Sequence, residues 1–275
     1  MAEVLLFGGL WVVLSGLAEY ALHPMATHFY IFTASNTAVD GQKAAAFIFM
    51  VALPVFIFVV LMLIYAPIRF RAKRGETGDS KVQRKHSKAF VLAWFSVSLV
   101  VNVFMFVHPT ASAVEGYFNS IPLGSKSTAP DGQQPLEVDV VARQWEWVYS
   151  IPEYGLTQTV NADGNDTLYL PVGREIKFVL RSYDQSHYYD PQAYVIHSFW
   201  IPAFGIKTDV IPGLTRYEYV TPTVISSTQQ NQMVRVQCAE VCGPGHPWME
   251  TNLHIVSPAD FASWVKAQQK LEASS

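Results

Sequence analysis

Residues 44–66 form an unbroken run of uncharged positions, and this run limits the possible folds more than any other feature. A helix of that length spans the roughly 30 Å hydrocarbon core of a bilayer. Pro54 is tolerated inside such a helix because neighbouring helices or a local kink absorb the lost hydrogen bond. Residues 89–107 form a second uncharged run, which is just long enough to cross the bilayer in the opposite direction. The sequence therefore predicts a transmembrane helical hairpin over residues 44–108.

The segment between the two runs predicts how the hairpin is oriented. Residues 67–88 contain eight Lys or Arg and only two acidic residues. Short basic loops are typical of the cytoplasmic side. Everything after residue 110 is then expected to form one outward-facing domain, residues 110–275, large enough for a single hydrophobic core.

Residues 1–22 predict a further helix. Residues 4–22 are apolar apart from Ser15 and Glu19, and they lack the basic start and small-residue cleavage site of a signal peptide. We expect an extra transmembrane helix with its N-terminus inside. A helix lying at the membrane interface is the alternative.

The outward domain has the pattern of short strands. Segments rich in Val, Ile, Tyr and Phe alternate with Gly, Pro and Asn-Asp positions. This spacing predicts an all-β domain, an antiparallel sandwich or barrel, followed by a short amphipathic helix over residues 257–270. Residues 124–135 look like a linker. The predicted strands are residues 136–141, 167–172, 175–180, 194–201, 216–220 and 232–236.

Residues 238–249 combine the side chains of a soft-metal site. They read Cys-Ala-Glu-Val-Cys-Gly-Pro-Gly-His-Pro-Trp-Met and contain both cysteines of the chain. Thiolates with imidazole suit copper, zinc or iron–sulfur centres, and the nearby thioether favours copper over zinc. A disulfide is the alternative, but it would close a very small loop and leave His246 and Met249 without a role.

Four blocks in this order resemble subunit II of cytochrome c oxidase. After the hydrophobic hairpin come Gln-Trp-Glu-Trp at 144–147, Val-Ile-His-Ser-Phe-Trp at 195–200, Lys-Thr-Asp-Val-Ile-Pro-Gly at 207–213, and the cysteine loop. The resemblance covers nearly the whole chain from residue 44. It implies a cupredoxin-like sandwich that carries the binuclear copper centre CuA.

The resemblance also implies a ligand set of six residues. Cys238 and Cys242 would bridge two copper ions, and His197 and His246 would each supply one nitrogen. Met249 and the backbone carbonyl of Glu240 would be the weak ligands. The donor chemistry agrees, because a single blue-copper ion uses only one Cys with two His and a distant axial ligand.

Three further roles follow from the resemblance. Trp145 would be the surface indole through which an electron enters, the side chain of Glu240 would bind a magnesium or manganese ion shared with subunit I, and Asp209 would hold the domain against subunit I. Without the resemblance, Trp145 would be an ordinary aromatic residue of a strand, Glu240 a solvated carboxylate and Asp209 a turn residue.

The implied function is that of an electron-accepting subunit of a terminal oxidase in a bacterial plasma or inner membrane, with its copper domain on the outer face. Cytochrome c or a small copper protein would donate the electron. Haem in subunit I, one of several partner subunits embedded with this chain in lipid, would receive it for oxygen reduction coupled to proton pumping. The chain itself would only transfer electrons, and no nucleic-acid partner is expected.

Other functions fit part of the pattern. A nitric oxide reductase has a similar copper subunit, and a membrane-anchored copper electron carrier would need the same ligands. A structural zinc module would keep the ligands but transfer nothing, whereas a quinol oxidase subunit would lack them.

Two departures from the family pattern affect proton uptake and docking. Val91 stands where the family commonly has a Glu at the mouth of a proton channel, and residues 183–193 resemble an insertion before the His197 strand. Residues 110–275 hold 17 acidic and 10 basic residues. That excess of acid is suited to steering a basic donor, although an ordinary solvated surface would have it too.

Overall fold

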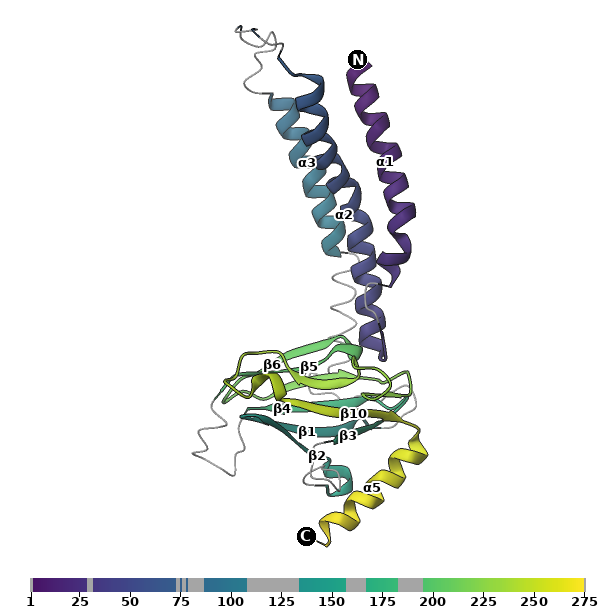
Figure 1. Ribbon diagram of the computed structural model, residues 1–275, viewed down its shortest axis with the longest axis vertical. Coiled ribbons are helices and arrows are strands. Elements are labelled where there is room, and N and C mark those ends of the chain that lie inside the picture. The colour runs from purple at the N-terminus through teal and green to yellow at the C-terminus, as the bar shows by residue number, and fades with distance from the viewer. Residues whose placement is uncertain are drawn as a thin grey trace. The chain divides into compact units, whose positions relative to one another are not determined.

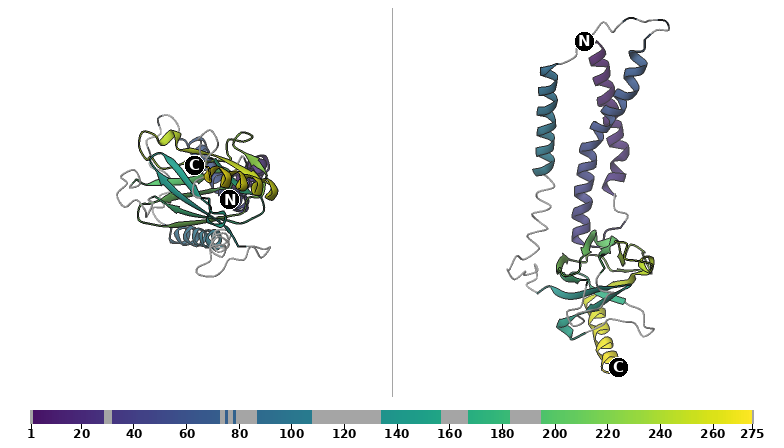
Figure 2. Two further views of the ribbon diagram at one scale, coloured as in Figure 1. Left: turned by 90° about the horizontal axis from the view of Figure 1, so that it is seen from below. Right: turned by 90° about the vertical axis from the view of Figure 1, so that its left-hand side faces the viewer.

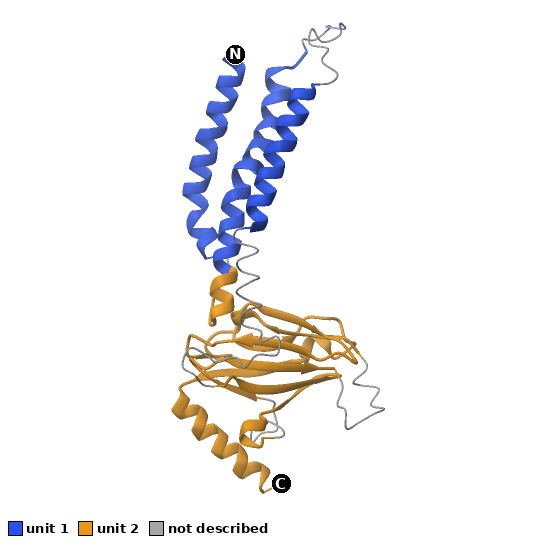
Figure 3. Ribbon diagram, turned by 180° about the vertical axis from the view of Figure 1, so that it is seen from behind, with its two compact units in different colours: residues 1–29, 42–115 blue, residues 30–41, 116–275 orange. Residues whose placement is uncertain are grey.

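The computed structural model describes residues 2–28, 32–72, 75, 78, 87–107, 134–156, 167–182 and 195–274. The chain divides into two compact units, residues 1–29 with 42–115 and residues 30–41 with 116–275 (Figure 3). Most of the predicted basic loop 67–88, nearly all of the linker 124–135, and the insertion 183–193 lie outside the described residues.

The first unit is helical. Its helices are α1 (Ala2–Thr27), α2 (Asn36–Arg69) and α3 (Lys88–Met105) (Figure 1). Each is long and apolar enough to cross a membrane. The two helices of the predicted hairpin are thus confirmed as helices, and residues 4–22 lie inside a longer α1.

Helix α1 lies antiparallel to α2 and contacts it along its length. Near one end, the Tyr65 hydroxyl donates to the Glu3 carboxylate at 2.6 Å. In the middle, the Trp11 indole donates to the carbonyl oxygen of Pro54 at 2.8 Å. At the other end, the Gln42 amide donates to the Ala26 carbonyl at 3.0 Å. Polar groups that would be costly in lipid are therefore paired between the two helices.

The second unit is a two-sheet β domain with a C-terminal helix (Figure 2). One sheet has the strand order β2-β1-β4-β7, and the other β3-β10-β9-β5-β6 with the short β8 beside β10. The strands are β1 (Leu136–Arg143), β2 (Glu146–Ser150), β3 (Thr167–Pro171), β4 (Ile176–Arg181), β5 (His197–Ile201), β6 (Ile206–Val210), β7 (Arg216–Val220), β8 (Ser226–Ser227), β9 (Arg235–Cys238) and β10 (Glu250–Val256).

The core lies between the two sheets because the strands alternate in burial. Along β1, Leu136, Val138 and Val140 are fully buried, while the residues between them are partly exposed. Strands β2, β9 and β10 show the same two-residue period, because successive side chains of a strand point to opposite faces. Residues of both sheets form one continuous cluster. The predicted membrane-anchored, cupredoxin-like β-sandwich is thus confirmed.

The structure corrects the predicted strand arrangement. The sheets are mixed rather than antiparallel, because β1 pairs in parallel with β4 and β3 in parallel with β10. A parallel pair needs a long crossover, and strands of the opposite sheet supply that length here. In place of the last predicted strand, residues 232–236, the structure has β9, which begins three residues later. Strands β2, β6 and β10 were not predicted as separate strands.

The C-terminal helix α5 (Pro258–Glu272) confirms the predicted amphipathic helix. The Ser257 hydroxyl caps it by accepting from the Asp260 amide at 3.1 Å. Phe261 and Val265 are buried one turn apart against the sandwich, as the helical period requires.

The connector between α1 and α2 is part of the β domain. The Ala34 amide donates to the Ala203 carbonyl at 2.7 Å, and the Thr223 amide donates to the Ala34 carbonyl at 2.8 Å. Ala34 and Ser35 are completely buried. We refer to residues 32–38 as the strap.

Candidate metal centre

Strands β5 and β9 hold two members of the predicted ligand set. His197 is the first residue of β5, and Cys238 is the last residue of β9. The two strands pair antiparallel, with Phe199 opposite Cys238. The Ala239 amide donates to the Ser198 carbonyl at 2.9 Å, which extends the pairing just past β9. A rigid sheet therefore positions one imidazole and one thiol.

The other members lie on the loop between β9 and β10. This loop ends in a single 3₁₀ turn, η5 (His246–Trp248). The Met249 carbonyl accepts the Cys238 amide at 3.0 Å, which closes the base of the loop. This hydrogen bond thus joins the two ends of the short loop, and side chains of the loop point back toward His197.

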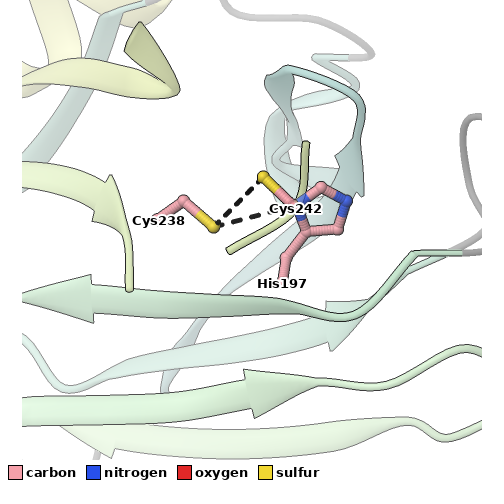
Figure 4. Close-up of side chains that lie close together, drawn as sticks. All are labelled: His197, Cys238 and Cys242. Carbon is pink, nitrogen blue, oxygen red and sulfur yellow. Dashed lines mark hydrogen bonds between the residues drawn. The ribbon is translucent and has the colours of Figure 1, made fainter. Parts of the chain in front are cut away.

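Two subsets of donors meet at the cysteine pair, of which Figure 4 shows Cys238 and Cys242 with His197. The Cys238 sulfur lies 3.8 Å from Nδ1 of His197 and 3.2 Å from the carbonyl oxygen of Glu240. The Cys242 sulfur lies 3.6 Å from Nδ1 of His246 and 3.8 Å from the Met249 sulfur. The two cysteine sulfurs are 3.7 Å apart. The structure thus brings together all six groups of the predicted ligand set.

These separations suit metal coordination. Two donors that each lie about 2.0–2.3 Å from a tetrahedral metal ion are separated by roughly 3.3–3.8 Å. The observed distances between neighbouring donors fall within or next to that interval. Both cysteines are free thiols, so the sulfurs remain available. His197, Cys238 and Cys242 form a buried cluster that could hold a metal ion.

Burial changes the acid–base properties of the cluster. Removal from water lowers the pKa of His197 to about 4, and the neighbouring His246 adds to this effect. Burial also raises the pKa of the Cys242 thiol to about 12, with the adjacent Cys238 as the second cause. Without a metal, the site therefore favours a neutral imidazole and a protonated thiol. A metal ion would have to displace the thiol proton, so binding is expected to release protons.

The loop is held from outside by side chains of the β1–β2 turn and of β2. The Gln144 amide and the Trp145 indole both donate to the Cys242 carbonyl, at 2.6 and 3.1 Å. The Trp147 indole donates to the Met249 carbonyl at 3.3 Å. Sequence reasoning singled out the tryptophans but missed Gln144, although it belongs to the same Gln-Trp-Glu-Trp block.

Gly245 allows the Trp145 ring to lie directly on the loop. A β-carbon at Gly245 would come within 2.2 Å of the indole ring. Only a residue without a side chain permits this contact. The indole nevertheless keeps 40% of its surface exposed, so it connects the loop to solvent.

The remaining predicted site residues lie at the surface. The side chain of Glu240 is exposed, while its carbonyl oxygen faces Cys238. Asp209 is exposed on β6, opposite Ser198 of β5. Val91 is exposed on α3.

The fold and the site together define a membrane-anchored protein with a cupredoxin-like β domain and a candidate metal centre. Residues 136–256 match the family described as cytochrome c oxidase subunit II, periplasmic domain. The similarity to this family thus covers the β domain from β1 to β10.

Curated relatives agree with the family match. The chain is 25% identical over 239 residues to an alternative cytochrome c oxidase subunit 2 of Bradyrhizobium diazoefficiens, with 78% of this chain and 75% of the relative covered. It is 27% identical over 220 residues to cytochrome c oxidase subunit 2 of Alkalihalophilus pseudofirmus, covering 80% of this chain but only 55% of that protein. The chain thus spans about half the length of the second relative.

A solved structure is also similar. The periplasmic domain of cytochrome oxidase subunit II (CoxB) of Bradyrhizobium japonicum is 26% identical, with a TM-score of 0.41. The similarity covers 53% of this chain and 98% of that domain.

Proposed function

We propose that this chain is the electron-accepting subunit II of a terminal cytochrome c oxidase. One observation carries the proposal: the two cysteine sulfurs lie 3.7 Å apart, and each has its own histidine nitrogen within 3.8 Å. A single blue-copper ion takes one Cys with two His and a weak axial ligand, so it does not require the second Cys. The duplicated arrangement is what a pair of copper ions bridged by sulfur requires.

The six groups would hold the binuclear centre CuA. Cys238 and Cys242 would bridge, His197 and His246 would each bind one ion, and the Glu240 carbonyl and the Met249 thioether would be the weak ligands. Bound there, the copper pair supplies a one-electron redox couple shared between two ions.

The surrounding residues would limit rearrangement during electron transfer. His197, Cys242 and Met249 are each at most 1% exposed. Trp147 packs edge-on against both His197 and Phe199. A dry and tightly packed environment leaves few dipoles to reorient when the charge changes.

Trp145 is the proposed entry point for the electron. Its exposed indole donates directly to the carbonyl of Cys242, a proposed bridging ligand. The donor would be cytochrome c or a small copper protein, and the acidic excess of residues 110–275 supports steering of a basic donor.

Haem in subunit I would accept the electron for reduction of oxygen coupled to proton pumping. In this assembly the exposed carboxylate of Glu240 would bind a magnesium or manganese ion shared with subunit I, and Asp209 would contact the same partner. The membrane would be a bacterial plasma or inner membrane, with the β domain on its outer face.

Metal analysis and spectroscopy of the purified chain test the copper assignment. We expect two copper ions per chain, a purple colour and near-infrared absorption. Cys242→Ser should abolish the near-infrared band, whereas Val241→Ala, which alters a side chain 79% exposed beside it, should keep it. One colourless zinc ion per chain would refute the assignment.

The partner distinguishes the remaining alternatives. A copurifying haem subunit with oxygen uptake supports an oxidase, whereas reduction of nitric oxide would support the reductase. Purification without any haem partner would favour a membrane-anchored copper carrier.

A further inference from the structure

The two cysteines of the candidate metal centre are held in different ways. Cys238 ends β9; its amide donates to the Met249 carbonyl at 3.0 Å, and the amide of Ala239 donates to the Ser198 carbonyl at 2.9 Å. Cys242 lies in the loop after β9, and within the described part of the chain no backbone hydrogen bond involves it. The sheet therefore fixes one thiol, whereas the other is held by side-chain contacts.

Gln144 makes the shorter of two hydrogen bonds to the Cys242 carbonyl. Its amide nitrogen lies 2.6 Å from that oxygen, whereas the Trp145 indole nitrogen lies 3.1 Å away. A carbonyl oxygen has two lone pairs and can accept both bonds. Gln144 is partly buried, but the indole keeps 40% of its surface exposed. The amide is thus the closer and the better shielded of the two donors.

Gly243, the residue after Cys242, lies directly under these two side chains. A β-carbon at Gly243 would come within 3.0 Å of the Gln144 amide nitrogen and 3.2 Å of the Trp145 ring. Gly243 has a φ of +115°, and glycine leaves the backbone free to adopt many other conformations. A contact from outside the loop is therefore needed to fix the peptide group that joins Cys242 to Gly243.

We propose that Gln144 is a positioning residue for the Cys242 half of the metal centre, by which we mean Cys242, His246 and Met249. Nδ1 of His246 and the Met249 sulfur lie 3.6 and 3.8 Å from the Cys242 sulfur. By holding the Cys242 carbonyl, Gln144 fixes the backbone from which this sulfur extends, and with it the 3.7 Å separation from the Cys238 sulfur. Side chains outside the ligand set commonly orient ligands in this way. The inference rests on the proposed copper centre.

Electron paramagnetic resonance of the copper-loaded full chain in detergent tests the positioning role. Gln144→Met keeps the length of the side chain and removes the donor. An electron shared equally by two copper ions couples equally to both nuclei, whereas displacement of one half makes the coupling unequal. We expect equal coupling in the parent protein and unequal coupling in Gln144→Met, with both ions still bound. Equal coupling in the variant would overturn the proposal.

Thiol alkylation of the metal-free full chain tests the same role without copper. The Cys242 side chain is buried, at 1% exposure, so it reacts only when the loop opens. Loss of one hydrogen bond in Gln144→Met should raise the alkylation rate of Cys242 about five-fold, while the rate of Cys238 stays the same. A glutamate-specific protease cuts after Glu240 and Glu250 and separates the two cysteines for mass spectrometry. An unchanged Cys242 rate in the variant would contradict the proposal.

Gln232→Met is the matched control. The Gln232 amide also donates to a backbone carbonyl of the β domain, that of Thr228 at 3.2 Å, so the same kind of bond is lost at another place. Both readouts should stay at the parent values in this control, and the same changes as in Gln144→Met would overturn the proposal.

A second variant covers the case in which Gln144→Met does not fold. Gln144→Glu keeps the shape of the side chain and replaces the donor by an acceptor. Its copper ions should also couple unequally to the electron, and equal coupling would overturn the proposal.

The two measurements separate this inference from the proposed function. A parent protein with a single colourless metal ion would refute the copper assignment, and the alkylation rates would then still decide whether Gln144 holds the Cys242 loop. A parent protein with an equally coupled copper pair, and no effect of Gln144→Met on either readout, would refute the positioning role alone.

Discussion

At the scale of single residues, the contact between Gly245 and Trp145 determines how the proposed electron entry point is built. The indole occupies the space of the missing side chain and reaches the Cys242 carbonyl. A side chain at this position would push the indole ring away from the loop between β9 and β10.

We therefore expect Gly245→Ala to weaken electron entry while both copper ions stay bound. The overlap with the ring should cost about 1–3 kcal/mol of unfolding free energy, relieved by movement of the indole. Stopped-flow oxidation of reduced cytochrome c and copper analysis measure the two effects. Gly16→Ala, which has open space around it, is the control, and unchanged kinetics in Gly245→Ala would argue against entry at Trp145.

The buried imidazole of His197 predicts the acid sensitivity of the metal-free protein. Its pKa falls from 6.5 to about 4 in the folded state, chiefly through burial. The unfolded chain therefore binds the extra proton first as pH falls. Above about pH 6.5 the imidazole is neutral in both states, so it does not lower the free energy of unfolding. Between pH 6.5 and 4 the free energy of unfolding falls, by at most about 3 kcal/mol.

Urea unfolding of the metal-free protein at several pH values measures this loss. His197→Gln should flatten the dependence in that window, because the variant has no group to protonate there. The same slope in the variant and the parent protein would contradict the assignment.

The groups that the structure brings together at the candidate metal centre were largely predictable from sequence, because five of the six lie within residues 238–249. His197, 41 positions earlier, was assigned only through the family resemblance. Gln144 could not be assigned from sequence, since its role is a contact across 98 positions of the chain. Spacing reveals a site within one loop but not the side chains that reach it from another strand.

At the scale of elements, the strap explains why the domain needs a segment from before α2. Ser35 is fully buried; its hydroxyl donates to the Phe204 carbonyl at 2.9 Å and accepts the Ala38 amide at 3.1 Å. It thus caps the start of α2 and satisfies a carbonyl of the β domain at once.

Ser35→Ala should lower the unfolding free energy of the domain by about 1–2 kcal/mol, because both groups lose a buried partner. Thermal unfolding in detergent, followed by β-sheet circular dichroism, measures the change. Thr33→Ala, in the same strap but only partly buried, should shift the midpoint much less. Equal shifts would show that the Ser35 hydroxyl has no special role.

The elements themselves were predicted unevenly. Helices α2 and α3 and strand β7 were found because their patterns are long or regular. Strands β6 and β10 were missed, since β6 contains Lys207, Thr208 and Asp209 and β10 alternates with polar residues such as Asn252 and His254. The strap carries no periodic signal, so its burial emerges only in three dimensions.

At the scale of the whole molecule, the helices and the charge of residues 67–88 predict one topology. The N-terminus should lie on the cytoplasmic side with the basic segment, and the C-terminus outside. The contacts between α1 and α2 support this arrangement, because Glu3 pairs with Arg69 at the end of α2 that leads into the basic segment.

Epitope tags test the topology in spheroplasts. A tag after residue 275 should be removed by external protease, whereas a tag before residue 2 should be protected until the membrane is permeabilised. Removal of both tags would mean that α1 does not span, and that the helix lies at the outer interface instead.

The buried strap also orders the events of biogenesis. Ala34 and Ser35 leave the ribosome long before strands β5 to β10, yet they complete the core those strands form. The emerging β domain must therefore close around a piece of chain that its own membrane helices have already anchored. Loading of the metal, which needs β5, β9 and the loop in place, would then follow both export and this closure.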